Sequence, residues 1–207
     1  MTRSTNLRQK LTLVILGRSG SGKGTQARFI LRRLKRQGVR HFETGRFLRE
    51  VLKKYRNPTI DLARKAMGSG KLFPDWFIAH ILLREIIERG AADQHWVFDG
   101  APRSLWQANL IEQVASWHAR ALPLAVHIAV GEKEARARLL RRARDDDRHR
   151  AIKNRLAFFA KKVLPVVRYY KSRGRLLAIN GEQPVYNVRQ DIDKALSRRL
   201  KTSWPKR

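Results

Sequence analysis

Cysteine is missing from this chain of 207 residues. Its absence excludes a disulfide framework, a thiolate nucleophile and a cysteine-bound zinc site, and it fits a reducing compartment. Long apolar runs are missing too, since no stretch approaches the roughly 18 to 20 unbroken apolar residues that a membrane span needs. The first ten residues also lack the apolar stretch of a secretory signal. We therefore expect a soluble cytoplasmic protein without a membrane span.

Linkers and repeats are scarce as well. The sequence has no tract rich in glycine, serine or proline and no self-similarity at a solenoid period. Its 43% hydrophobic and 30% charged residues provide enough apolar side chains for one sizeable core. We predict a single domain that spans residues 1–207.

Acidic residues are few: 17 aspartates and glutamates face 46 lysines and arginines, a formal net charge of +29. The excess is spread along the chain rather than confined to a tail. Such a charge attracts polyanions through its long-range field and through counterion release. Nucleic acids, anionic membrane surfaces and phosphorylated small molecules are therefore all candidate partners at this point.

Four short runs of apolar residues have the character of strands buried on both faces. They cover residues 11–16, 95–98, 124–128 and 176–179. Helix-length segments lie between and after them, at about residues 23–37, 44–56, 58–68, 74–89, 104–119, 131–143, 149–172 and 185–201. Strands that alternate with helices predict a layered α/β fold, with a parallel sheet flanked by helices. Pro165 is expected to kink or break the 149–172 helix, because proline lacks the N–H that an α-helix needs.

The firmest motif follows the first of these strands. Residues 17–25 read Gly-Arg-Ser-Gly-Ser-Gly-Lys-Gly-Thr, which fits the phosphate-loop pattern Gly-x-x-x-x-Gly-Lys with a predicted helix after it. Glycines let the backbone wrap around phosphate, N–H groups at the helix N-terminus point at the anion, and Lys23 neutralises charge on the transferred phosphoryl group. The next position, where a hydroxyl usually faces magnesium, holds Gly24, and the hydroxyl is displaced to Thr25.

That displacement is informative, because Gly-Lys-Gly-Thr-Gln at residues 22–26 resembles the adenylate kinases and related nucleoside monophosphate kinases. Further segments resemble this family, in the family's own order, along about residues 11–193. They are Glu-Thr-Gly-Arg-Phe-Leu-Arg at 43–49, Gly-Lys-Leu-Phe-Pro-Asp at 70–75, Phe-Asp-Gly-Ala-Pro-Arg at 98–103, the arginine-rich stretch at 138–155 and Gly-Glu-Gln-Pro-Val at 181–185. Six matches in one order argue against chance.

The resemblance implies a three-layer phosphate-loop NTPase fold, with a monophosphate-binding arm at about 44–73 and a vestigial lid of the short type at about 142–147. It implies magnesium-dependent transfer of the γ-phosphoryl group from ATP to a nucleoside monophosphate, with AMP as the leading acceptor. We expect a monomer whose partners are these two nucleotides, with no membrane partner. Pyrimidine or deoxynucleoside monophosphates stay an alternative, since base choice depends on few contacts.

The resemblance also implies the roles of individual residues. Catalysis would fall to Lys23, Arg103, Arg142, Arg144 and Arg155. ATP would lie against Gly20, Ser21, Gly22, Lys23, Gly24, Thr25, Arg138, Arg142 and Gln183. The monophosphate would lie against Thr44, Arg49, Lys71, Leu72, Phe73, Gly100, Ala101, Pro102, Arg103, Gln107, Arg144 and Arg155. Arginine suits this chemistry because its planar guanidinium binds phosphate oxygens in pairs and stays protonated.

Some of these positions also have a plainer explanation. Thr44 could instead cap the 44–56 helix, since threonine is a fair N-cap, and Gln107 could be an exposed helix residue. Asp99 ends a predicted buried strand, where acidic side chains seldom lie without a partner and where open α/β sheets bind their ligands. We predict that Asp99 and Thr25 face the magnesium ion, through water.

The sequence departs from the family pattern at several positions. Arg46 replaces the aspartate expected near the magnesium water shell, and Ala143 alone separates two of the lid arginines. With so short a lid, we expect poorer exclusion of water and a raised ATP hydrolysis side reaction. Ala101 replaces a phenylalanine, and Arg18 occupies a phosphate-loop position that is usually small or neutral, so both could alter substrate choice.

Catalysis does not account for the positive charge. Setting aside Lys23 and the six arginines assigned to the nucleotides leaves 39 basic groups against 17 acidic ones. Nonspecific association with nucleic acid therefore stays open, as does a nucleic-acid-associated nucleotide-binding protein with weak kinase activity. No aromatic signature of RNA binding stands out in the sequence itself.

Overall fold

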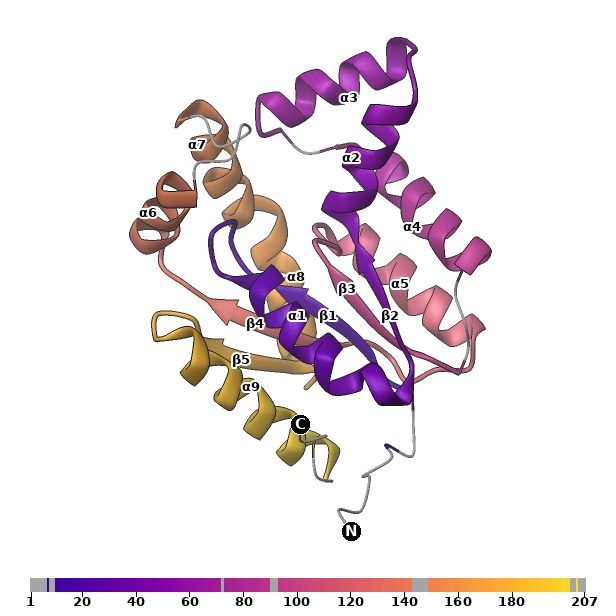
Figure 1. Cartoon of the computed structure of the whole chain (residues 1–207), viewed down its shortest axis with the longest axis vertical. Coiled ribbons are helices and arrows are strands. Elements are labelled where there is room, and N and C mark those ends of the chain that lie inside the picture. Colours follow the sequence, from indigo (N-terminus) through magenta and orange to yellow (C-terminus); the bar gives the residue numbers. More distant parts are fainter. Residues whose placement is uncertain are drawn as a thin grey trace.

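The computed structural model describes residue 7, residues 10–71, 73–89, 93–142 and 149–201, and residue 204. Figure 1 shows a central sheet with helices on both of its faces. In this described part of the chain, no helix is both long and apolar enough to cross a membrane.

Five parallel strands form the sheet in the order β2-β3-β1-β4-β5. Their bounds are β1 Thr12–Leu16, β2 Val39–Glu43, β3 His95–Asp99, β4 Leu124–Ala129 and β5 Leu176–Asn180. The central strand β1 is buried along its whole length, with Val14 opposite Phe98 on one side and Ala125 on the other. The chain first fills one side of β1 and then the other, and open α/β sheets bind ligands where the strand order reverses in this way.

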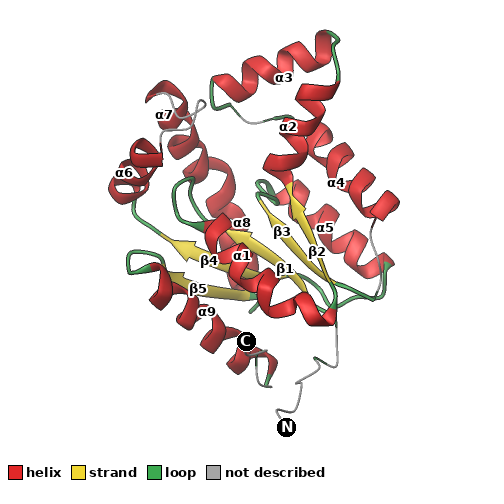
Figure 2. Ribbon diagram, in the orientation of Figure 1, coloured by secondary structure: helices red, strands yellow, loops and turns green. Residues whose placement is uncertain are grey.

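Helices cover both faces of the sheet, as Figures 1 and 2 show. The α-helices are α1 Lys23–Leu34, α2 Thr44–Lys54, α3 Pro58–Gly68, α4 Asp75–Arg89, α5 Leu105–Trp117, α6 Glu132–Arg142, α7 His149–Phe158, α8 Leu164–Ser172 and α9 Val185–Leu200. A 3-10 turn at Lys35–Gln37 extends α1, and a π turn at Phe159–Val163 joins α7 to α8.

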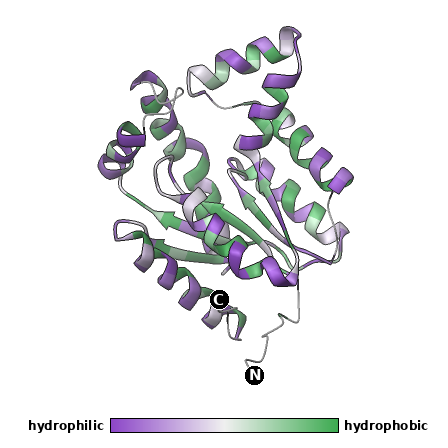
Figure 3. Cartoon of the chain, in the orientation of Figure 1, coloured by the Kyte–Doolittle hydropathy of each residue, from purple (hydrophilic) through white to green (hydrophobic). Residues whose placement is uncertain are grey.

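Alternation along β1 divides the core into two halves. Leu13 and Ile15 pack with residues of α1 and α9, whereas Val14 and Leu16 pack with residues of α4, α5 and α8. This follows from strand geometry, because successive side chains point to opposite faces. Figure 3 shows the central strands β1, β3 and β4 coloured as hydrophobic along most of their length. The buried sheet therefore holds in place the loops at the carboxyl ends of its strands.

The four predicted strands are confirmed to within one residue at each end, but sequence reasoning missed β2. This edge strand reads Val-Arg-His-Phe-Glu, and only Phe42 among its residues is buried. The contacts that hold β2 are distant in sequence. Phe42 stacks on Phe98 with 4.6 Å between ring centroids, and the Arg40 guanidinium pairs with Glu85 of α4 at 3.0 Å. A short polar segment stabilised in this way shows no clear strand pattern by itself.

The predicted helices are all present, with ends within two residues of expectation once the 3-10 and π turns are included. The interruption expected at Pro165 takes the form of the π turn at Phe159–Val163. Pro165 then lies in the first turn of α8, a position where a helix tolerates the missing N–H.

Two helical projections flank the carboxyl ends of the strands in Figure 1. One consists of α2 and α3, which form most of the segment predicted as the monophosphate arm. The other consists of α6 and α7, which come before and after the predicted lid. Of that lid only Arg142 is described, and the remainder of residues 142–147 lies outside the described residues.

Candidate active site

The phosphate loop joins β1 to α1 between the two projections. Gly20 and Gly22 have φ values of 84° and 85°, which residues with a side chain rarely adopt. A Cβ atom on Gly20 would lie 2.4 Å from the Ala135 carbonyl oxygen of α6, so the loop packs closely on that helix. Because α1 begins at Lys23, the unpaired N–H groups of its first turn lie at the loop, as in anion-binding helix termini.

Lys23 is half-buried and reaches back across the loop. Its Nζ donates a hydrogen bond of 2.7 Å to the Arg18 carbonyl oxygen. Burial lowers the pKa of Lys23 to about 8, with Arg103 and Arg142 adding to the shift and Asp99 opposing it. The ammonium group thus lies near two other cations, and Asp99 does not fully balance their charge. This arrangement favours the binding of a polyanion.

Asp99 ends β3 and is the acidic group that acts on Lys23. Burial raises the pKa of Asp99, its sheet neighbour Glu43 raises it further, and Lys23 and His41 lower it. Within the described residues, no three carboxylate or histidine side chains form a ready-made metal cluster.

Arg103 and Arg155 converge on Lys23. Together these three side chains contribute to the lining of a small pocket of about 30 Å³ between the phosphate loop, the loop after β3, and α7. The Nε of Arg103 donates a hydrogen bond of 2.6 Å to the Gly100 carbonyl oxygen, which fixes the direction of the guanidinium. Burial lowers the pKa of Arg103, and the charge of Arg155 lowers it further, whereas Asp99 opposes the shift. Three cations from distant segments therefore meet at one point.

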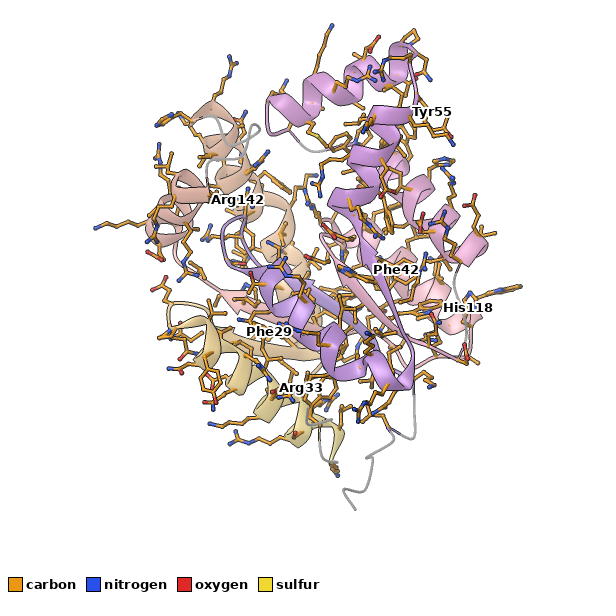
Figure 4. All side chains as sticks on the ribbon, viewed as in Figure 1. Phe29, Arg33, Phe42, Tyr55, His118 and Arg142 are labelled. Carbon is orange, nitrogen blue, oxygen red and sulfur yellow. The ribbon has the colours of Figure 1, made fainter. Side chains whose placement is uncertain are left out.

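Arg142, the last residue of α6, approaches from the opposite projection. Figure 4 labels it beside the phosphate loop, and its charge contributes to the lowered pKa of Lys23. Arg138 lies one turn earlier on α6 and is held by an ion pair with Glu134 at 2.6 Å. Both arginines line the cleft that the phosphate loop also lines.

This cleft is open and has a volume of about 600 Å³, within the usual range of ligand pockets. Its walls are the phosphate loop, the ends of β2 and β3, the arm and the helices α6 and α7. The predicted site residues that line it are Gly20, Gly22, Lys23, Gly24, Thr25, Arg49, Lys71, Phe73, Asp99, Gly100, Arg103, Arg138, Arg142 and Arg155. Residues predicted for the two nucleotides therefore share one cavity.

Six predicted residues do not line the cleft: Ser21, Thr44, Ala101, Pro102, Gln107 and Gln183. Pro102 lines the small pocket instead. The Nε2 of Gln183 donates hydrogen bonds to the Asn180 carbonyl oxygen at 3.0 Å and to Asp191 Oδ2 at 2.7 Å. For its Nε2 to contact ATP, Gln183 would have to break these two hydrogen bonds.

The capping role considered for Thr44 is wrong. The N-cap position of α2 belongs to Glu43, and its side chain makes no capping hydrogen bond. Thr44 is the first helical residue, its side chain is buried beside Gly100, and its hydroxyl has no hydrogen-bond partner among the described residues. A buried polar group of this kind is usually completed by water or a ligand.

Gln107 is not an exposed helix residue either, since it is fully buried. Its Oε1 accepts a hydrogen bond of 2.8 Å from the backbone N–H of Arg103, and its Nε2 donates one of 2.6 Å to Asp75 Oδ1. The Ser104 hydroxyl donates to the same Asp75 oxygen at 2.8 Å. In this structure Gln107 therefore positions the backbone that carries Arg103.

The two unusual cations of the motifs do not line the cleft. Arg46 pairs with Glu50 of its own helix at 3.8 Å. The Nε of Arg18 donates a hydrogen bond of 3.1 Å to the Val130 carbonyl oxygen, and its guanidinium lies 4.5 Å from the ring centroid of Phe159. Neither residue lines the cleft, so neither adds its charge directly to the cavity wall.

The cleft also contains residues that sequence reasoning did not assign to the site. They are Ser19, Arg28, His41, Glu43, Gly45, Leu48, Met67, Gly70 and Phe158. Recognising β2 as a strand would have placed His41 and Glu43 at the ligand-binding edge of the sheet. The predicted residues Leu72 and Arg144 lie outside the described residues.

A parallel sheet with a phosphate loop after its central strand, and a cleft lined by converging arginines, defines a phosphate-loop nucleotide kinase. A family model described as adenylate kinase matches residues 15–175. The chain belongs to the adenylate kinase family.

Curated relatives agree with this assignment. The adenylate kinase of Prochlorococcus marinus strain SARG is 35% identical over 191 residues, which cover 91% of this chain and 100% of the relative. Adenylate kinase 1 of Nostoc sp. PCC 7120 is 33% identical over 184 residues, covering 89% and 97%. An adenylate kinase of Bacteroides fragilis is 32% identical over 193 residues, covering 90% and 98%.

Proposed function

We propose that this chain catalyses the reversible transfer of the γ-phosphoryl group of ATP to AMP, which yields two molecules of ADP. The observation that carries the proposal is the convergence of Lys23, Arg103, Arg142 and Arg155 on one cleft. Phosphoryl transfer needs two anionic substrates held in line and neutralisation of charge on the moving oxygens, with little covalent participation by the protein. A cleft lined by cations from both sides meets these needs.

On the donor side, the phosphate loop would hold the β- and γ-phosphates of ATP through its backbone N–H groups and Lys23. The phosphate charges would return Lys23 to its fully protonated state, because nearby anions raise the pKa of an amine. Arg138 and Arg142 line the same cleft from α6, and we assign them to the ATP phosphates.

On the acceptor side, Arg49, Lys71 and Phe73 contribute from the arm and Arg103 from the loop after β3. We assign Arg103 to the phosphate of AMP, because a guanidinium held in a fixed direction can bind two phosphate oxygens at once. Arg155 shares the small pocket with Lys23 and Arg103. We assign it to the transferring phosphoryl group, where charge must be stabilised during the reaction.

In the proposed reaction, magnesium binds together with ATP. Mg²⁺ prefers oxygen ligands and is commonly bound through one or two carboxylates together with substrate phosphates. The cleft offers the carboxylate of Asp99 and the hydroxyl of Thr25, and this donor set fits such an ion. When bound with the nucleotide, the ion neutralises charge at the phosphate oxygens. We assign Asp99 and Thr25 to it, through water.

A panel of acceptors tests the proposed reaction. Purified protein with ATP and magnesium would be assayed with AMP, CMP, UMP, GMP and dTMP in turn. We expect the highest kcat/KM with AMP, whereas a preference for CMP, UMP or dTMP would replace this proposal with the pyrimidine alternative. Turnover by Lys23→Ala equal to that of the wild type would point to a contaminating kinase and overturn the assignment.

Two matched arginine variants, one inside the cleft and one outside it, test the role of the converging cations. Arg103→Met should lower kcat by on the order of 10³-fold, as for other arginines that stabilise phosphoryl transfer. Arg84→Met removes an arginine that pairs with Glu88 at 2.9 Å outside the cleft, and it should leave kcat within about twofold. Equal losses in the two variants, with unchanged Tm, would contradict a specific role for Arg103.

Three further predictions concern the whole protein. We propose that the active form is a monomer, and sedimentation during turnover tests this. The single domain and the cytoplasmic location stay predictions.

A further inference from the structure

The outward side of α5 carries two tryptophans that the core does not use. Trp106 is 51% exposed and Trp117 is 88% exposed. They lie eleven residues apart, which is close to three full turns, so both residues lie on the same side of the helix, about 16 Å apart along its axis. Between them this side presents the exposed amides Asn109 and Gln113.

The neighbouring element is strongly basic. The π turn, α8 and the residue after it expose five cations: Lys161, Lys162, Arg168, Lys171 and Arg173. Tyr169 of α8 fixes the two helices against each other, because its hydroxyl lies 3.0 Å from both Asn109 Oδ1 and Glu112 Oε2 of α5. The Arg173 guanidinium lies 3.8 Å from the centroid of the Tyr169 ring. Basic side chains therefore run alongside the helix that carries the tryptophans.

The charge of this surface is not neutralised within the protein. Glu112 is the acidic residue of α5, and Arg175 already pairs with it at 2.8 Å. The π turn and α8 contain no aspartate or glutamate. In the described part of the chain, none of the five cations forms an ion pair. The surface thus attracts an anion that lies outside the protein.

We propose that this α5–α8 face, made of the two tryptophans, the two amides and the five cations named above, binds single-stranded nucleic acid. Proteins that bind single strands combine aromatic side chains, on which unpaired bases stack, with cations that follow the backbone. The face supplies both, together with amides that can bond base edges. Duplexes fit it poorly, because their bases are already stacked and paired.

An anionic membrane is the main competing partner for tryptophan and lysine together. Helices that lie in a membrane interface need a broad apolar face. Here the outward side of α5 places the polar residues Asn109 and Gln113 between its tryptophans, so the apolar area is interrupted. Isolated rings separated by hydrogen-bonding groups suit bases better than acyl chains.

The α5–α8 face is separate from the catalytic cleft. None of its nine residues lines that cleft or the small pocket beside it. Binding of nucleic acid is therefore an activity beyond the proposed kinase reaction, and each can fail without the other.

Fluorescence anisotropy of a labelled 16-nucleotide oligo(U) tests the proposal, titrated with full-length protein from 50 to 200 mM salt. Trp117→Ala should weaken binding about tenfold, since it removes one stacking platform. Trp76→Ala is the matched control, because Trp76 is an exposed tryptophan at the start of α4, and it should change affinity less than twofold. The double variant Arg168→Glu and Lys171→Glu should weaken binding and flatten its salt dependence.

All three variants should keep the wild-type Tm and the wild-type kinase rate. The proposal is overturned if binding vanishes at 150 mM salt, or if Trp117→Ala and Trp76→Ala have the same effect. It is also overturned if a duplex of equal length binds as tightly, or if vesicles with 30% phosphatidylserine bind while oligo(U) does not. The last result would assign the face to a membrane surface.

Discussion

Lys23 should take up a proton when ATP binds near pH 8. The pKa of Lys23 in the free protein is about 8 instead of 10.5, because burial, Arg103 and Arg142 disfavour the ammonium form more than Asp99 favours it. The triphosphate of ATP brings several negative charges close to Nζ. These charges favour the ammonium form, so the pKa in the complex should return toward its ordinary value, and ATP binding becomes linked to protonation.

The size of this effect follows from the pKa. At pH 8 roughly half of the free protein would carry a neutral Lys23, so binding should take up about 0.5 proton per ATP. The uptake should be about 0.1 proton at pH 7 and about 0.9 at pH 9. The affinity for ATP should accordingly fall about tenfold between pH 7 and pH 9, since the competent protonated form becomes scarce.

Calorimetric titration with ATP in two buffers of different ionisation enthalpy measures the uptake directly. Lys23→Arg is the control, because a guanidinium stays protonated and should show no uptake at this position. Asp99→Asn removes the charge that raises the pKa of Lys23, so uptake at pH 7 should increase. Equal uptake at pH 8 in the wild type and Lys23→Arg, or an ATP affinity that is flat from pH 7 to 9, would refute the reasoning.

Gly20→Ala and Gly22→Ala separate backbone strain from crowding in the phosphate loop. Both positions have positive φ, so each alanine should lower the free energy of unfolding in urea by about 1–2 kcal/mol. Gly20→Ala should cost more, because only its Cβ would meet the Ala135 carbonyl oxygen, at 2.4 Å, and equal losses would contradict this. His95 is fully buried, and burial lowers its pKa from 6.5 to about 4. Below pH 6.5 the unfolded chain therefore binds the proton more tightly than the folded protein does, and the free energy of unfolding decreases as the pH falls. Between pH 7 and 5 this histidine should cost about 2 kcal/mol. Burial also lowers the pKa of His127 to about 4, so urea titrations should find a loss in every variant, but one about 2 kcal/mol smaller in His95→Gln than in the wild type and in His80→Gln.

The phosphate-loop part of the cleft could be predicted well from the sequence because its determinants are local. Strand β1 is a run of apolar residues, the phosphate loop follows within one residue, and α1 begins at Lys23 as the motif requires. The helices were predictable for the same reason, since their apolar periodicity and flanking residues lie within each segment. Asp99 was also placed correctly at a strand end, because a buried strand signals its own end.

Other features depended on residues far apart in the chain. Strand β2 is held by Phe98 and Glu85, about 40 to 60 residues away. Gln107 has the sequence context of an ordinary helix residue, yet Asp75 from another helix and the backbone of Arg103 bury and bond it. The residues next to β2 and to Gln107 in the sequence do not indicate these distant partners.

The sequence by itself therefore determined the chemistry that the chain can offer: a glycine cradle, a lysine and a set of arginines in a fixed order. Only the tertiary structure decided which of those charges meet, which are held elsewhere as Arg18 is by Val130 and Phe159, and how far the pKa of Lys23 falls. The physical reason is that charge interactions and desolvation depend on distance and burial in space, and parallel strands bring together segments that local sequence cannot relate.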